Sequence, residues 1–371
     1  MLLLFYKVCI YISMKKVHII FGGASVEHDV SIVTALQVAN ALKGKYEVGL
    51  IYISKENKFY LSKKTTPADY IDKENLIKSS TPILLHDKAI YKCCKKKSKY
   101  LEAVEVVVNC CHGGIGEDGR LKGFLDINEI PMSSCSTLSA ELCMDKEATK
   151  LIAKSINIPV VEYLCLNKFD FSVLKDAQSL GDNLIVKPCG LGSSIGVVKS
   201  NIKNLKENIE MVLTLDDKVL IEREIEPLVE YNCAVIRDGG ELILSQIEQP
   251  INKNEILSFE DKYLQVEKTR ILPAEIGEDL QQTIYSYTKK IYEYLGLNGV
   301  VRIDYLFDTK NGIVYLNEIN TVPGSLAFYL FEGIGIDYVR LLEILIKNAK
   351  VKPLQTYFSS NILNNLKQIG K

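Results

Sequence analysis

The residues best suited to chemistry lie near the C-terminal end of the 371-residue chain, in the stretch GVVRIDYLFDTKNGIVYLNEINTVPGS at positions 299–325. Two runs in which apolar and polar residues alternate are typical of β-strands, and the Asn-Gly between them favours a hairpin turn. A two-residue loop would place the polar side chains on opposite faces. A three-residue loop, Lys310-Asn311-Gly312 with the glycine in the left-handed conformation, instead pairs apolar with apolar residues. We therefore expect the hairpin to pair Asp304 with Glu318, Arg302 with Asn320, Ile303 with Ile319, and Leu306 with Leu316.

This register gathers two carboxylates, an amide oxygen and a guanidinium on one face of the hairpin. Adjacent carboxylates resist joint ionisation unless a cation lies between them. Oxygen ligands suit Mg²⁺, which takes its remaining ligands from water and substrate phosphates. Arg302 beside them is suited to a phosphate or a developing oxyanion. The alternative is a solvent-facing hairpin with a salt bridge, which leaves Asn320 and the following Thr-Val-Pro-Gly unexplained.

Composition favours a globular protein with small-molecule partners. Lys and Arg number 45 against 46 Asp and Glu, so no basic stripe indicates nucleic-acid binding. The ten cysteines form no C-x-x-C, a pattern typical of a reduced, cytosolic protein. The first 13 residues are apolar but too short to span a bilayer, so we expect no membrane segment. Met14 is the expected natural start, which would make residues 1–13 an extension.

Two glycine-rich segments each follow a predicted buried strand. GGASVEHDVS at 22–31 follows the strand 17–21, and HGGIGEDGR at 112–120 follows the strand 104–110. Alternating strands and helices predict a doubly wound parallel sheet, whose sites lie at the carboxyl ends of its strands. Glu27 in the first segment is suited to a substrate ammonium, or alternatively is only a helix-start carboxylate. His112 opens the second segment, where the glycines around it offer little core for a purely structural histidine.

The middle of the chain carries a further phosphate-binding pattern. A helix is predicted from Ser139 to Ser155, and the strand beginning at Leu184 leads through Lys187 into the loop CGLGSSIG at 189–196. A strand lysine before a Gly/Ser loop places an ammonium and backbone N–H groups over phosphates, although it is not a Walker loop. The alternative is an ordinary flexible hairpin. Residues 250–269 lack periodicity, and unpatterned loops of this length in compact domains are usually functional.

Taken together, these segments resemble the D-alanine–D-alanine ligases of the ATP-grasp superfamily, from about Met14 to Lys347. The resemblance is carried, in family order, by GGASVEHDVS, HGGIGEDGRLKG, MDK, IVKPCGLGSSIGV, VLIE, EDKY, RID and NEINTVPG. It implies an α/β fold with an N-terminal doubly wound parallel-sheet domain at 14–142. Two α+β subdomains, 143–228 and 229–371, would enclose ATP between them.

The resemblance also implies roles for individual residues. ATP would be bound by Lys146, Lys187, Ser194, Glu222 and Glu230, and two Mg²⁺ (or Mn²⁺) ions by Asp304, Glu318 and Asn320. Glu27, with Ser193 and Tyr263, would orient the ammonium of the first D-alanine, and His112 would lie near its carboxylate. Arg302 and the backbone N–H of Gly324 would stabilise the oxyanion, and Lys262 would assist phosphate transfer from a closing loop. The acceptor carboxylate would meet Ser325, Tyr329 and Leu330.

The implied reaction is ATP-dependent ligation of two D-alanines through an acyl phosphate, in a cytoplasmic homodimer that supplies peptidoglycan precursors. The sequence departs from the family pattern at Tyr329, where many members carry a serine that binds the acceptor carboxylate, and at Leu191, where an acidic residue is common. D-Serine, D-lactate or another amino acid is therefore an alternative acceptor. An ATP-grasp carboxylase and a non-catalytic ATP-binding regulator are further alternatives; the absence of a biotinyl-lysine domain argues against the first, and the intact lysine and carboxylate positions argue against the second.

Overall fold

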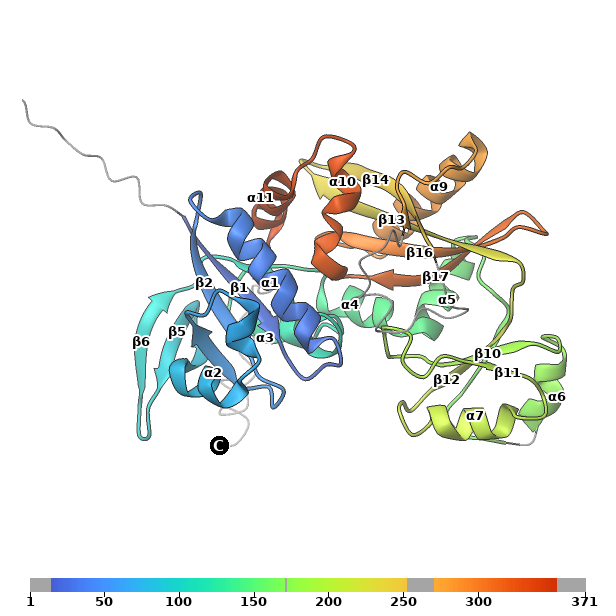
Figure 1. The fold of residues 1–371 in the computed structure, drawn as a ribbon, viewed down its shortest axis with the longest axis horizontal. Coiled ribbons are helices and arrows are strands. Elements are labelled where there is room, and N and C mark those ends of the chain that lie inside the picture. The colour runs from blue at the N-terminus through green and yellow to red at the C-terminus, as the bar shows by residue number, and fades with distance from the viewer. Residues whose placement is uncertain (1–14, 171, 252–269, 352–371) are drawn as a thin grey trace, which may run out of the picture.

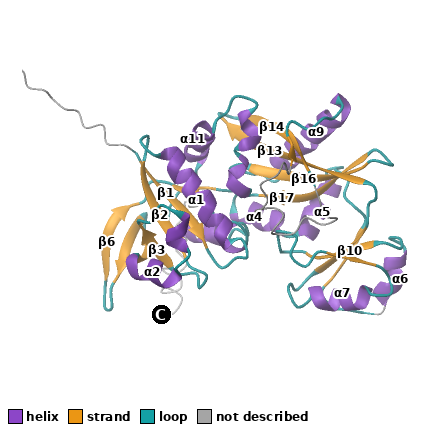
Figure 2. Cartoon of the chain, viewed as in Figure 1, coloured by secondary structure: helices purple, strands orange, loops and turns teal. Residues whose placement is uncertain are grey.

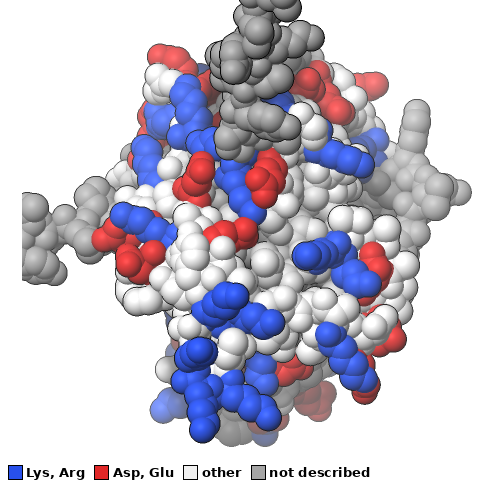
Figure 3. Space-filling model, turned by 90° about the vertical axis from the view of Figure 1, so that its left-hand side faces the viewer, with Lys and Arg blue, Asp and Glu red and all other residues white. Residues whose placement is uncertain are grey.

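The computed structural model describes residues 15–170, 172–251 and 270–351, which form three β-sheets with helices packed against them (Figure 1). Figure 2 shows the helices lying against the faces of the sheets. No helix in the described ranges is long and apolar enough to cross a membrane. Lys, Arg, Asp and Glu side chains are interspersed on the molecular face drawn in Figure 3.

The N-terminal sheet has eight strands in the order β6-β5-β4-β3-β2-β1-β7-β8. Its parallel part consists of β1 (Lys16–Gly22), β2 (Glu47–Ile53), β7 (Val107–Asn109) and β8 (Met132–Ser133). Around it lie α1 (His28–Leu42), α2 (Lys73–Ser79) and α3 (Arg120–Ile127), with short 3₁₀ turns at Pro67–Tyr70 and Gly114–Gly116. The predicted doubly wound parallel core is confirmed.

The sequence did not predict the antiparallel extension of this sheet, because the stretch between residues 54 and 103 is largely polar. It consists of β3 (Phe59–Ser62), β4 (Thr81–His86), β5 (Ala89–Cys93) and β6 (Ser98–Ala103). These strands are exposed at many positions, so their apolar residues are too sparse to mark them by periodicity alone.

The second sheet, in the order β11-β10-β12-β9, carries the Gly/Ser loop. Its strands are β9 (Tyr163–Leu166), β10 (Leu184–Pro188), β11 (Val198–Ser200) and β12 (Val219–Arg223), and α6 (Ser172–Gln178) and α7 (Leu205–Val212) share its core. The single helix predicted from Ser139 to Ser155 is wrong. The chain forms α4 (Thr137–Met144) and α5 (Lys146–Ser155), because Asp145 ends the first helix and caps the second by accepting the N–H of Ala148 at 3.0 Å.

The third sheet, in the order β15-β14-β13-β16-β17, contains the predicted hairpin. Its strands are β13 (Leu228–Asp238), β14 (Glu241–Pro250), β15 (Arg270–Ile271), β16 (Val301–Asp308) and β17 (Ile313–Asn320). One apolar face packs on α9 (Glu278–Tyr294). A 3₁₀ turn (Gly324–Ala327), α10 (Tyr329–Glu332) and α11 (Tyr338–Asn348) follow.

The hairpin register is confirmed where it matters for chemistry and wrong near the turn. Arg302 pairs with Asn320, and Asp304 pairs with Glu318, as predicted. The loop has four residues rather than three, since Asp308 pairs with Ile313, although Gly312 has the predicted left-handed φ of 68°. A β-bulge after Asp304 corrects the offset, so that Leu316 meets Tyr305 and not Leu306.

The last described segment of the chain returns to the N-terminal sheet. Leu326, Leu330 and Phe331 lie in the same hydrophobic cluster as Ile32 and Leu36 of α1. Figure 1 shows this segment, in red, beside α1, in blue. The turn after β17 is therefore held between the third sheet and the N-terminal domain.

Candidate active site

The polar face of the third sheet brings together the four residues predicted from the hairpin. The guanidinium of Arg302 donates two hydrogen bonds to the Asp304 carboxylate, both at 2.7 Å, and the side-chain amide of Asn320 donates a third at 3.0 Å. Glu318 lies opposite Asp304 on the neighbouring strand. In this arrangement the guanidinium supplies positive charge to the Asp304 carboxylate.

The same face extends two strands further than the sequence predicted. The pairing Glu248–Asn232–Asp304–Glu318 forms one transverse row across β14, β13, β16 and β17. The amide of Asn232 donates to Glu248 at 3.2 Å. Because alternate residues share a face, Glu230 lies on this face too, two positions before Asn232.

Two buried lysines share one buried carboxylate at β10 and β12, the two central strands of the second sheet. Glu222 lies 2.5 Å from the ammonium of Lys150 and 2.8 Å from that of Lys187, with relative exposures of 3%, 0% and 6%, respectively. Burial alone would raise the pKa of Glu222, but the two ammonium groups lower that pKa to about 2. Lys187 also donates to Asn317 at 3.2 Å, which joins this cluster to the hairpin of the third sheet.

Lys146 and the Gly/Ser loop hold one another in place. Lys146 is the first residue of α5, and its ammonium donates to the backbone carbonyl of Leu191 at 2.6 Å. Burial lowers the pKa of Lys146 from its ordinary value. At the root of the loop the N–H of Gly190 donates to Asp216 at 2.6 Å. The ammonium is thus positioned at the loop predicted to cover phosphates.

Glu27 connects the N-terminal domain to the same loop. The hydroxyl of Ser193 donates to the Glu27 carboxylate across 166 positions in sequence. Gly113, with φ of 65°, approaches so closely that a Cβ there would lie 2.8 Å from a Glu27 carboxylate oxygen. Glu27 stands at the start of α1 but makes no side-chain cap hydrogen bond. Its carboxylate therefore does not cap the helix, and its role as a ligand for an ammonium stays a prediction.

His112 is buried, with 2% exposure, and both ring nitrogens have partners. Nε2 lies 2.7 Å from Thr34 Oγ1, and Nδ1 lies 2.7 Å from the carbonyl oxygen of Val322. Burial lowers the pKa of this imidazole. Burial together with the Glu27 carboxylate raises the pKa of neighbouring Glu117 well above its ordinary value.

Gly324 and Ser325 lie in the turn after β17, beside His112 and α1. A Cβ built on Gly324 would meet no atom of the described residues within 4 Å, so these residues leave the space before Gly324 open. The N–H of Ser325 donates to Thr34 Oγ1 at 3.2 Å. The side chain of Leu330 is fully buried in the core, which leaves only its backbone to take part in binding.

Tyr329, the main departure from the family pattern, already has partners within the protein. Its hydroxyl donates to Glu248 at 3.1 Å, and the Arg270 guanidinium lies 4.2 Å from its ring centroid. Arg270 also lies 3.5 Å from Glu248. A phenol has one O–H group with which to donate, and here that group donates its hydrogen bond to Glu248.

Of the remaining predicted residues, Ser194 adopts a left-handed φ of 58° in the Gly/Ser loop, and Lys262 and Tyr263 lie outside the described residues. The sequence reasoning missed Lys150, Asn317, Glu248 and Thr34. Lys150 follows Lys146 by four positions on α5, a spacing that could have revealed it. Asn317 could not have been found, because the bulge that presents it interrupts the alternation of the strand.

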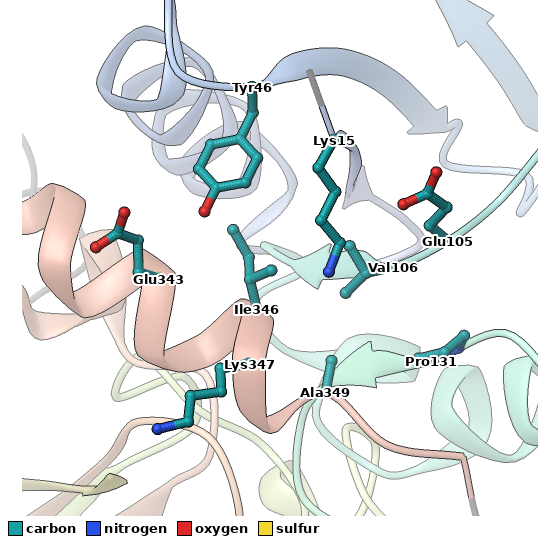
Figure 4. A pocket seen from close by; sticks show the side chains of 9 residues that line it. All are labelled: Lys15, Tyr46, Glu105, Val106, Pro131, Glu343, Ile346, Lys347 and Ala349. Atoms are coloured by element: carbon teal, nitrogen blue, oxygen red, sulfur yellow. The ribbon is translucent and has the colours of Figure 1, made fainter. Parts of the chain in front are cut away.

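A separate surface hollow lies where the start of β1 and the end of α11 approach one another (Figure 4). Lys15, Tyr46, Glu343 and Lys347 are among its lining residues. None of the predicted site residues lines it, so it is distinct from the candidate active site.

Buried lysines beside a Gly/Ser loop, facing a carboxylate-bearing sheet, define a site for a phosphorylated ligand in an α/β protein. The family models described as D-ala D-ala ligase N-terminus and C-terminus match residues 16–135 and 152–347. The chain belongs to the D-Ala-D-Ala ligase family, and the predicted ATP-grasp fold is confirmed.

Individual relatives match this chain over about nine-tenths of its length. A D-alanine–D-alanine ligase of Thermosipho melanesiensis is 36% identical, covering 90% of this chain and 93% of its own. The crystal structure of D-alanine–D-alanine ligase from Helicobacter pylori has 30% identity and a TM-score of 0.73, covering 91% of this chain and all of that chain. The VanG D-Ala:D-Ser ligase structure from Enterococcus faecalis has 27% identity and a TM-score of 0.78, covering 90% and 99%, respectively.

Proposed function

We propose that this protein joins two D-alanine molecules into D-alanyl-D-alanine at the expense of ATP. The observation that carries the proposal is the contact between Glu27 and Ser193, which sets a carboxylate for a substrate ammonium beside the Gly/Ser loop. A nucleotide site alone would suit many ligases. The carboxylate at this place adds recognition of an amino acid, in agreement with the family to which the chain belongs.

ATP binding follows from the two lysine positions. Lys146 and Lys187 neutralise the phosphates, and Glu222 holds Lys187 in position through its 2.8 Å ion pair. The Gly/Ser loop with Ser194 covers the phosphates from the other side, and Glu230 takes the ribose hydroxyls. Each ammonium is bonded to protein oxygen here, so nucleotide binding exchanges these partners for phosphate oxygens.

Asp304, Glu318 and Asn320 fit Mg²⁺ or Mn²⁺ by their chemistry. Two carboxylates and an amide oxygen on adjacent strands are hard ligands, too few for a complete shell, as is usual where phosphates supply the rest. The described residues contain no group of three or more His, Cys, Asp or Glu side chains that could hold a metal ion. When bound, the metal would neutralise charge on the transferring phosphoryl group.

The reaction consists of two displacements. A carboxylate oxygen of the first D-alanine attacks the γ-phosphorus of ATP, the bond to ADP breaks, and an acyl phosphate forms. The amine nitrogen of the second D-alanine then attacks the acyl carbon, the bond to phosphate breaks, and the ammonium proton is lost to phosphate or water. Glu27 orients the first substrate, while Arg302 and the N–H of Gly324 stabilise the oxyanion.

D-Alanine is the proposed acceptor. The Tyr329 ring is larger than a serine side chain and is held by Glu248 and Arg270, so it reduces the space for a second substrate. Its hydroxyl is committed to Glu248, which leaves Ser325 and backbone groups to bind the acceptor carboxylate. A cytoplasmic homodimer is part of the proposal, and light scattering of the purified protein tests the dimer.

The test is ADP release by the full-length protein with ATP and Mg²⁺, comparing D-alanine, D-serine, D-lactate and L-alanine. We expect rapid release with D-alanine and a dipeptide identified by mass spectrometry. Faster turnover of D-alanine with D-serine or D-lactate would change the acceptor. ATP binding without ADP release under any of these conditions would overturn the enzyme assignment.

A further inference from the structure

The turn that follows Gly324 has an unusual backbone. Ser325, Leu326 and Ala327 have φ values of 49°, 53° and 50°, three consecutive left-handed residues that all carry a Cβ. This conformation is unfavourable for such residues and persists only where the surroundings hold it. Because Gly324 directly precedes the three, anything that holds them also determines where its N–H points.

A short chain of hydrogen bonds ties both ends of this turn to the N-terminal domain. Ser325 N–H lies 3.2 Å from Thr34 Oγ1, which lies 2.7 Å from Nε2 of His112. Nδ1 of the same ring lies 2.7 Å from the carbonyl oxygen of Val322. Residues 322 and 325 flank Gly324 and are thus joined through one threonine and one histidine.

The direction of each hydrogen bond follows from its atoms. A carbonyl oxygen only accepts, so Nδ1 of His112 carries the proton, and in the neutral ring Nε2 is the acceptor. The Thr34 hydroxyl therefore donates to Nε2 and uses a lone pair to accept from Ser325. Burial, which lowers the pKa of His112, favours this neutral form. The Glu27 carboxylate raises the pKa of the ring and the Arg302 guanidinium lowers it, while the Glu117 carboxyl group lies 4.0 Å from Nδ1.

The histidine itself is fixed to α1 independently of its ring. The backbone N–H of His112 donates to Ser31 Oγ at 2.9 Å, and Ser31 lies one helical turn before Thr34. Ser31 in turn donates to the carbonyl of Glu27 at 3.2 Å. Glu27 at the start of α1, and the hydroxyls of Ser31 and Thr34 that contact His112, thus lie within one short segment, residues 27–34.

We propose that Thr34 is a positioning residue, which through His112 holds the Val322–Ser325 turn so that the Gly324 N–H faces the reacting carboxyl group. This inference rests on the proposed function, because the oxyanion exists only if ligation occurs. Thr34 acts through the turn and does not touch substrate. An oxyanion donor contributes only at the correct distance, so its displacement lowers kcat more than substrate binding.

Three variants of the full-length protein test the proposal. Thr34→Val removes the hydroxyl with little change in shape, and Thr34→Ser restores it. Thr288→Val is the matched control, since Thr288 is also fully buried, with its hydroxyl 2.8 Å from Tyr305, on the opposite, apolar face of the third sheet. If Thr34→Val does not fold, Thr34→Cys takes its place, because a thiol of similar size is a weaker hydrogen-bonding group.

We expect Thr34→Val to lower kcat about tenfold or more, with the KM for ATP unchanged. Thr34→Ser should stay within about twofold of wild type, and Thr288→Val should lose thermal stability but keep kcat. Equal kcat values for Thr34→Val and Thr288→Val would overturn the positioning role. Absence of ligation by the wild-type protein would instead refute the proposed function, so the two failures are distinguishable.

Discussion

Replacing Glu222 by glutamine removes the one carboxylate that the ammonium groups of Lys150 and Lys187 share, while keeping the shape of the side chain. Glu222 has a relative exposure of 3%, so water screens the cluster poorly. The variant leaves two like charges facing each other in a buried site. Breaking a buried ion pair on one side is strongly destabilising for this reason.

The expected magnitude follows from the pKa of Glu222. A fall from the ordinary value of 4.5 to about 2 corresponds, at about 1.4 kcal/mol per pH unit, to about 3 kcal/mol favouring the ionised folded state. Since the folded pKa is the lower one, this stability is present above pH 4.5 and is lost as the pH falls towards 2. The variant should therefore differ most from wild type near neutral pH.

Urea unfolding followed by circular dichroism at pH 7 measures the effect, with the m-value compared between variants to detect a change in cooperativity. We expect Glu222→Gln to lose about 3 kcal/mol. The double variant Lys150→Met/Glu222→Gln should recover part of the loss, because one unpaired ammonium is removed. A loss below about 1 kcal/mol, or a double variant less stable than the single one, would refute the ion-pair reasoning.

Three substitutions in the proposed site have distinct expected outcomes. Glu318→Gln should fold normally but lower turnover at least about a hundredfold and weaken Mn²⁺ binding in the presence of ATP, measured by electron paramagnetic resonance; an unchanged Mn²⁺ affinity would contradict the ligand role. Tyr329→Phe should leave the acceptor KM within about twofold, because the hydroxyl donates to Glu248, whereas a loss of roughly 1 to 3 kcal/mol would mean that it reaches the substrate. Glu27→Gln should raise the KM for the first D-alanine at least about tenfold without changing that for ATP, and an equal rise in both would indicate a structural role instead.

The chemistry of the hairpin could be predicted from the sequence because strand alternation is local. The period of two places Arg302 and Asp304 on one face, and matching the apolar faces selects the pairing with Asn320 and Glu318. The loop length could not be predicted in the same way. A four-residue loop with a bulge and a three-residue loop without one give the same pairing at Asp304, and in the four-residue arrangement of the structure Asn317 accepts a hydrogen bond from Lys187.

The sequence by itself determined the alternating strands and helices of the parallel core, the Gly/Ser loop with its lysine, and the polar face of the hairpin, since each is encoded by neighbours a few positions apart. Only the tertiary structure decided which distant groups share a site. Thr34 and Ser325 are 291 positions apart, and their hydrogen bond depends on packing of the final turn against α1. Lys150 meets Glu222 because the fold buries α5 beside β12, where the Lys150 ammonium also lies 5.5 Å from the centroid of the Tyr163 ring. Such pairings arise from the cost of burying charged and polar groups without partners, which depends on the assembled core and not on local periodicity.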